Sequence, residues 1–259
     1  MADPLAGAWF KVIWAHQHVD ELKRHIALYF DHTPYTTPIQ RHGDIAIVQA
    51  PRLYSRPHLD IQGIIGDCLG AARSSLDYII WELASRYANR PLIPSSLGGK
   101  DDLTFPLYTD PVKWAKYDFA SNRAPHFKLP ASVIAAIESV QPHKVGYEPL
   151  GLLHILVNQD KHRLPLLVEG HIKHGPIGLS LGNHVATVAQ STAMSVAFHA
   201  PLDVLPVERS HEMKVDANIE SKFVAFGDPT MPWEPVEVTL ENIVRCAEKV
   251  VGRFTEFLV

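Results

Sequence analysis

The stretch that decides the fold is residues 60–88, DIQGIIGDCLGAARSSLDYIIWELASRYA. Its apolar side chains recur at steps of three and four residues, the spacing that keeps them on one face of an α-helix. These apolar positions are Ile65, Cys68, Leu69, Ala72, Leu76, Ile79, Ile80, Leu83 and Tyr87. The stripe predicts one long helix with a buried face, and the prolines from Pro91 onward predict its end.

Helical spacing also occurs on both sides of this stretch. It predicts further helices over residues 8–31, 131–139, 149–163 and 239–258, the last with Thr239 as its N-cap. The connection from about residue 91 to 130 is rich in aromatic residues, so we expect it to pack on the helices rather than to be disordered.

Residues 164–238 have a different pattern, because short β-like runs alternate there with glycine and proline. The runs cover 164–168, 177–181, 194–199 and 219–226, and residues 43–50 have the same character. The whole pattern predicts an α+β fold, in which a helical bundle core carries an antiparallel β insertion in the C-terminal half. We expect a single domain over 1–259, with the helical core over about 8–163 and 239–258 and the insertion over about 164–238.

Composition describes an ordinary globular protein of 259 residues, 46% hydrophobic and 20% charged. A net charge of −4 argues against a broad polyanion-binding surface but leaves room for a local basic pocket. The two cysteines lie far apart in apolar patterns, so we expect no disulfide framework and a reducing compartment. No signal peptide or membrane span is recognisable, and we therefore expect a cytoplasmic protein with no membrane partner.

A first polar cluster, Arg73-Ser-Ser-Leu-Asp77-Tyr78, interrupts the long apolar helix. Arg73 and Asp77 share a row with three glycines, Gly63, Gly66 and Gly70. Each glycine costs a helix about 1 kcal/mol relative to alanine, so the row predicts close approach of another backbone or a ligand. Arg73 and Asp77 can form an ion pair at the rim of a packing groove, or Arg73 can face an anion.

A second polar cluster, Asn158-Gln-Asp160-Lys161-His162-Arg163, ends the helix predicted over 149–163. Gly151, His154, Asn158 and either Lys161 or His162 share a stripe, whereas Asp160 and Arg163 point toward a neighbouring element or the helix end. Basic residues in a last helical turn are also favoured by the helix dipole.

The two rows could meet if their helices packed face to face. Arg73, Asp77, His154, Asn158 and His162 would then lie together, and a histidine among charged neighbours suits acid–base chemistry near neutral pH. Lys161 and Arg163 beside them would stabilise a developing anion.

The order and spacing of these motifs resemble a family of uncharacterised bacterial and phage proteins over roughly residues 10–168. The resemblance rests on Ile65-Gly66-Asp67, Arg73 to Tyr78, Phe105-Pro106, Gln141-Pro142 and Leu152 to Arg163. In that family the first motif reads Arg-Ser-Ala-Leu-Asp-His, which is similar to the short motif of HEPN-type helical ribonucleases and toxins. The resemblance implies metal-independent enzymes, often dimeric, whose arginine and histidine act on RNA phosphodiesters. Here Tyr78 occupies the histidine position, and a tyrosine with a pKa near 10 is a poor base at neutral pH.

Three functional hypotheses remain open from the sequence. In the first, a non-catalytic interaction module, Asp77, His154, Asn158, Asp160 and Arg163 form a buried polar network that specifies helix packing. In the second, a metal-independent endoribonuclease or toxin, Arg73, His162 and Lys161 act on phosphate. The third, a metal-dependent hydrolase, is disfavoured because no familiar metal-binding motif is present. We therefore expect no metal and no cofactor, and as partner either RNA, another protein or a second copy of the chain.

Overall fold

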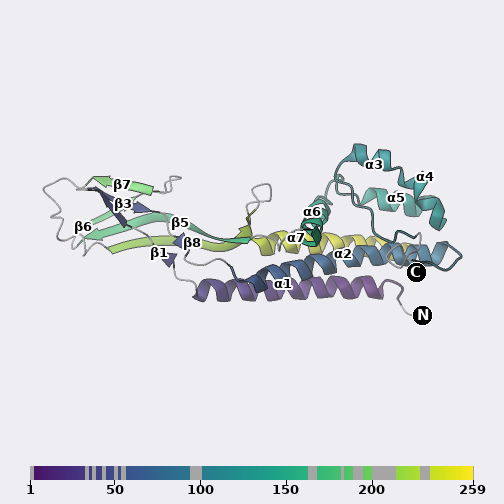
Figure 1. Ribbon diagram of the computed structural model, residues 1–259, viewed down its shortest axis with the longest axis horizontal. Helices are drawn as coiled ribbons and strands as arrows, with labels where there is room; N and C mark the ends of the chain where they lie inside the picture. Colours follow the sequence, from purple (N-terminus) through teal and green to yellow (C-terminus); the bar gives the residue numbers. More distant parts are fainter. Residues whose placement is uncertain are drawn as a thin grey trace. The chain divides into compact units, whose positions relative to one another are not determined.

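The computed structural model describes part of the chain (Figure 1). The described residues are 3–32, 35–36, 39–42, 45–49, 52–53, 57–93, 101–162, 168–181, 184–188, 195–199, 214–227 and 234–258. Of these, the residues within 35–53, 161–162 and 172–222 are described by their backbone alone.

The chain separates into two compact units. A helical unit comprises Met1–His25, Leu59–Leu167 and Val236–Val259, and a strand unit comprises Ile26–His58 and Val168–Pro235. The predicted α+β class is confirmed. The predicted insertion matches the second part of the strand unit, but 26–58 belongs to that unit as well and not to the helical core. The prediction that both units form a single domain stays a prediction.

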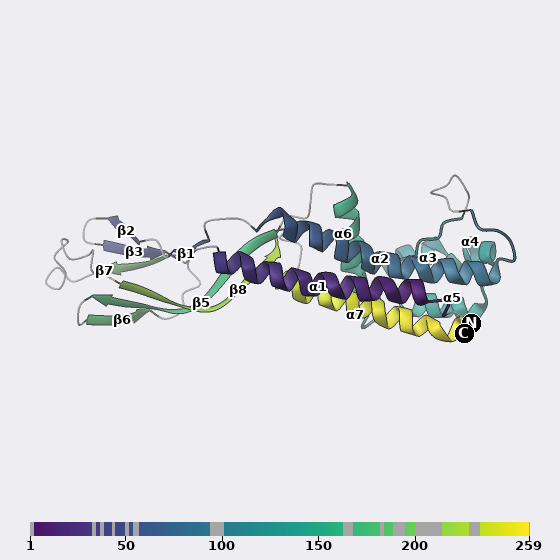
Figure 2. The ribbon, with the colours of Figure 1, turned by 90° about the horizontal axis from the view of Figure 1, so that it is seen from below.

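The helical unit is built on α1 (Ala6–His32) as far as His25, α2 (Leu59–Tyr87) and α7 (Val236–Phe254), which run side by side in both views (Figure 2). α1 and α2 are antiparallel, since Cys68 of α2 donates its thiol to the carbonyl of Ala15 while Tyr78 lies against Gly7. The predicted stripe on residues 60–88 is confirmed, because its members from Ile65 to Leu83 are all buried.

The start of α7 differs from the prediction. The helix begins at Val236, and Thr239 is buried inside it instead of capping it. The reason is that the buried stripe of this helix reaches back to Val236, one turn before Leu240. Pro235 directly precedes the helix, where its fixed φ and missing N–H are tolerated.

Shorter helices complete this unit: α3 (Pro111–Tyr117), α4 (Phe119–Asn122), η2 (Ala124–Phe127), α5 (Ala131–Ser139), α6 (Pro149–His162) and η4 (Thr255–Phe257). α5 and α6 match the predicted helices. Asp118 ends α3 in the left-handed conformation, and its carboxylate caps α4 by accepting from the N–H of Ser121. The aromatic connection does pack as expected, with Phe105, Trp114 and Phe119 buried.

The strand unit is antiparallel throughout its described pairs. Its strands are β1 (Tyr35–Thr36), β2 (Ile39–His42), β3 (Ile45–Gln49), β4 (Arg52–Leu53), β5 (Val168–Leu181), β6 (His184–Val188), β7 (Ser195–His199) and β8 (Lys214–Phe226). They form sheets in the orders β6-β5-β8, β2-β3-β7 and β1-β4. β3 pairs with β7, which is why the early strands join the later ones in one unit. β5 shifts register against β8 around Gly175-Pro176, where proline has no N–H for the ladder.

Candidate functional site

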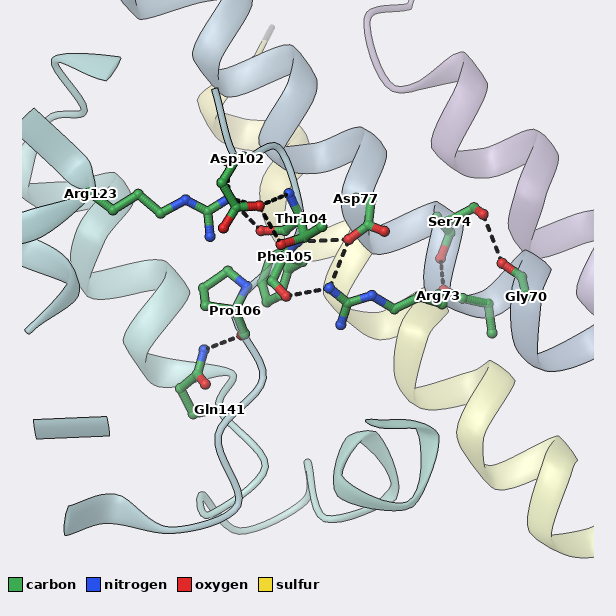
Figure 3. Close-up of polar contacts among 12 residues, drawn as sticks. Gly70, Arg73, Ser74, Asp77, Asp102, Thr104, Phe105, Pro106, Arg123 and Gln141 are labelled. Atoms are coloured by element: carbon green, nitrogen blue, oxygen red, sulfur yellow. Dashed lines mark hydrogen bonds and ion pairs between the residues drawn. The ribbon is translucent and has the colours of Figure 1, made fainter. Parts of the chain in front are cut away.

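Arg73 and Asp77 both form hydrogen bonds with the backbone of one residue, Phe105 (Figure 3). The Arg73 Nη2 donates to the carbonyl oxygen of Phe105 at 2.6 Å, and the Asp77 Oδ1 accepts from the N–H of Phe105 at 2.7 Å. The same two atoms form an ion pair at 2.9 Å. The predicted ion pair is therefore present, and it is used to hold a chain segment.

The segment that contains Phe105, residues 101–108, has side-chain hydrogen-bond partners along its length. We call it the clasped segment. Arg123 donates to the carbonyl oxygens of Asp102 and Thr104. Gln141 donates to the carbonyl of Pro106 and accepts from the N–H of Tyr108 at 3.1 Å. Side chains thus satisfy an irregular backbone that would otherwise bury unpaired polar groups.

The start of the clasped segment is held by its own carboxylate. Asp101 is buried and ion-paired with Arg90 at 2.6 Å, contacts His126 at 2.9 Å and accepts from the N–H of Ile93 at 2.7 Å. The hydrogen bond from Arg90, followed by those from Ile93 and His126, holds the pKa of Asp101 well below its ordinary value against the opposing effect of burial.

The second polar row, on α6, makes contacts of another kind. Asn158 Nδ2 donates to His154 Nε2 at 3.2 Å, and Asn158 itself is exposed. Burial lowers the pKa of His154, and the positive charge of Arg73 lowers it further. Both effects favour the neutral imidazole, the form that can accept the bond from Asn158.

α2 and α6 pack together, and the charge of Arg73 acts on His154, whereas a meeting of the two whole rows stays a prediction. A Cβ built on Gly66 would lie 3.2 Å from the Asp160 Oδ1, so the close neighbour there is a side chain and not the predicted backbone or ligand, while Asp160 does point toward the neighbouring helix. The expectation is wrong for Gly63 and Gly70: nothing lies within 4 Å of a Cβ built on either, because both face outward from the helix.

The remaining predicted residues can be placed only in part. Lys161 and His162 close α6, and their side chains lie outside the described residues, as does the whole of Arg163. Tyr78 lies five positions after Arg73, about 140° further around the helix. It packs on Gly7 of α1, away from the clasped segment.

Most of the residues that hold the clasped segment could not be recognised from the sequence. These residues are Arg90, Asp101, Arg123, His126, Gln141 and His143. From the sequence, Gln141 entered only as part of the Gln141-Pro142 motif of the resemblance, with no side-chain role assigned to it. An amide or a guanidinium on its own gives no periodic signal, and these partners are 11 to 35 residues apart in sequence.

The two cysteines are free, and burial raises the pKa of Cys68 to about 12 and that of Cys246 to about 11. Over the described part of the chain, His, Cys, Asp and Glu side chains nowhere gather in the groups of three that a metal ion would need. None of the described helices has the length and apolar character that crossing a bilayer requires. Comparison with protein-family models, curated proteins and solved structures found no match.

Proposed function

We propose that this protein is a non-catalytic interaction module whose polar network fixes the surface of a helical unit. One observation carries the proposal: Arg73, the residue best suited to a phosphate, has its Nη2 bonded to the Phe105 carbonyl and to Asp77. Its side chain is 13% exposed. A guanidinium placed this way acts on the protein's own backbone.

The network supports such a role because Arg73 and Asp77 join α2 to the irregular clasped segment, while Arg123 and Gln141 hold the same segment from turns between helices. A typical hydrogen bond contributes about 1 kcal/mol net, but an orphaned buried partner costs about 1–3 kcal/mol. Misplacing the clasped segment would orphan several groups together, so one arrangement is strongly preferred. A surface specified in this way suits binding to a partner.

Hydrogen exchange at Phe105 tests this structural role. The Phe105 N–H should exchange slowly in the wild type and quickly in Asp77→Ala, which removes its acceptor. Asp77→Asn should give an intermediate rate, since the amide oxygen can still accept the bond. Equal exchange rates in the three proteins would contradict the proposal.

One observation favours a second candidate, metal-independent cleavage of RNA. His154 is kept neutral partly by the charge of Arg73, and a neutral imidazole near a guanidinium is suited to proton transfer. HEPN-like activity, with His162 and Lys161 on the phosphate, would build on the same helices.

A cleavage assay separates the two candidates. The purified chain is incubated with labelled total RNA in excess chelator, beside Arg73→Ala and His162→Ala. We expect no cleavage, together with lower stability of Arg73→Ala. Cleavage by the wild type that is lost in both folded variants would overturn the interaction-module proposal and establish the ribonuclease.

A further inference from the structure

Aromatic side chains gather on the outward face of the α1–α2 pair. Phe10, Trp14, Tyr78 and Trp81 are exposed to 58%, 45%, 40% and 40%, and the rings of Phe10 and Trp14 stack with centroids 6.1 Å apart. We call these four residues the aromatic face. The hydrogen bonds that hold the clasped segment come from other residues, although Trp81 follows Asp77 by one helical turn.

The four rings belong to one surface because two helical rows meet. Gly7, Phe10 and Trp14 follow one another at steps of three and four on α1. On α2 the corresponding row is Gly63, Gly70, Ser74, Tyr78 and Trp81. The rows touch where the Tyr78 ring covers Gly7, since a Cβ built there would lie 2.8 Å from the ring.

The middle of the outer face of α2 carries few charges, and the exposed Asp60 and Arg86 lie nearer the two ends of the helix. Its exposed positions from 63 to 85 are Gly63, Asp67, Gly70, Tyr78, Trp81 and Ser85, of which one is charged. α7, by contrast, exposes four charged residues, Arg245, Glu248, Lys249 and Arg253. Aromatic enrichment with few charges is the composition of an interface core.

We propose that the aromatic face binds a second copy of this chain, forming a two-fold symmetric dimer. The inference rests on the proposed function, because it names the partner of the interaction module. At about 200 Å² for each fully exposed ring, the four side chains leave on the order of 350 Å² of apolar surface open. A dimer interface buries about 800 Å² per partner, of which about 65% is apolar. The aromatic face therefore supplies most of the apolar core that a stable dimer needs.

The same face also offers the recesses that its own rings would fill. Space above Gly63 and Gly70 is open, and both lie in one row with Tyr78 and Trp81. A two-fold axis crossing α2 near Ala72 places Trp81 of one copy over Gly63 of the other and Ser74 over Gly70. Two such faces carry few charges and therefore repel each other little.

Analytical ultracentrifugation of the full chain over a range of concentrations tests the proposal. The wild type should sediment with twice the chain mass, and Gly70→Arg and Trp81→Arg should sediment as monomers with unchanged far-ultraviolet circular dichroism. Gly252→Arg, at an exposed glycine on α7, is the matched control and should remain a dimer. A monomeric wild type at every concentration, or dimers of both face variants, would overturn the proposal.

Cross-linking keeps the test decisive if a face variant fails to fold. Ser74→Cys treated with a short bismaleimide should give a covalent dimer, whereas Ser121→Cys on α4 should not. Cys68 and Cys246 are buried with raised pKa values and should react little. Absence of the Ser74→Cys dimer would overturn the dimer. RNA cleavage would instead overturn the proposed function, so the two failures are distinguishable.

Discussion

Arg73 and Asp77 on α2 bond to the backbone of Phe105, 32 and 28 residues away, whereas His154 and Asn158 on α6 bond to each other. Both pairs are spaced i,i+4 near an exposed or half-exposed helix face. The difference lies in what covers them. The clasped segment lies over the α2 pair, and the α6 pair stays half open to solvent. Two polar pairs with the same spacing therefore contribute differently to stability, because only the pair on α2 forms hydrogen bonds with a covering irregular backbone.

The largest loss in the free energy of unfolding is expected for Gln141→Leu. Gln141 is fully buried and bonds to Pro106, Tyr108 and Ile137, so an apolar side chain of similar size orphans several buried backbone groups. We expect a loss of about 3 kcal/mol in the free energy of unfolding, measured by urea denaturation. A loss below about 1 kcal/mol would mean that the clasped segment finds other partners.

Arg73→Ala should cost about 2 kcal/mol, because it orphans the Phe105 carbonyl and removes the ion-pair partner of Asp77. His154→Ala, the matched change on α6, should cost below about 1 kcal/mol, since its partner Asn158 is exposed and can bond to water. Equal losses in the free energy of unfolding, measured by urea denaturation, would contradict the expected difference between the pairs on α2 and α6.

Acid should act on the network through Asp101. Because its pKa is depressed in the folded chain, its stabilising contribution is complete above the unfolded value of about 4 and is lost as the pH falls toward the folded value. As the pH falls below about 4, the melting temperature should therefore decrease more steeply for the wild type than for Asp101→Asn. Parallel declines would show that Asp101 does not drive the acid transition.

The pKa of His154 measures how strongly the two rows are coupled. Nuclear magnetic resonance titration should place it below the usual 6.5 in the wild type, and Arg73→Ala should raise it only partway, because burial is the larger cause. The neutral ring stabilises the fold above about pH 6.5, and this contribution is lost as the pH falls through the folded pKa. An unchanged pKa in Arg73→Ala would show that the rows are electrostatically independent.

Asp160→Ala should have the smallest effect, within about 0.5 kcal/mol, because Asp160 is exposed and its described contact is with Gly66. A network centred on both rows would instead make this change as costly as Arg73→Ala. Urea denaturation of the two variants side by side decides between a network on α2 alone and one that spans both helices.

Much of the fold could be predicted because it depends on local periodicity. The buried stripe from Ile65 to Leu83 identified α2, and similar stripes identified α1, α5, α6 and α7. The start of α7 was misplaced by one turn, since Thr239 resembles a cap until the burial of Val236 is known. In the strand unit, β5 and β8 matched the expected β-rich region.

The sequence by itself determined α1, α2, α5, α6 and α7, the α+β class and the two positions where polar residues interrupt apolar stripes, because each follows from spacing along the chain. It did not predict α3 and α4, which lie in the connection from about residue 91 to 130. Only the tertiary structure decided that β3 pairs with β7 and that Phe105 lies between Arg73 and Asp77. It also decided that Gly66 is covered while Gly63 and Gly70 are open. These are contacts between distant segments, and no local pattern encodes which backbone will come to lie over a given side chain.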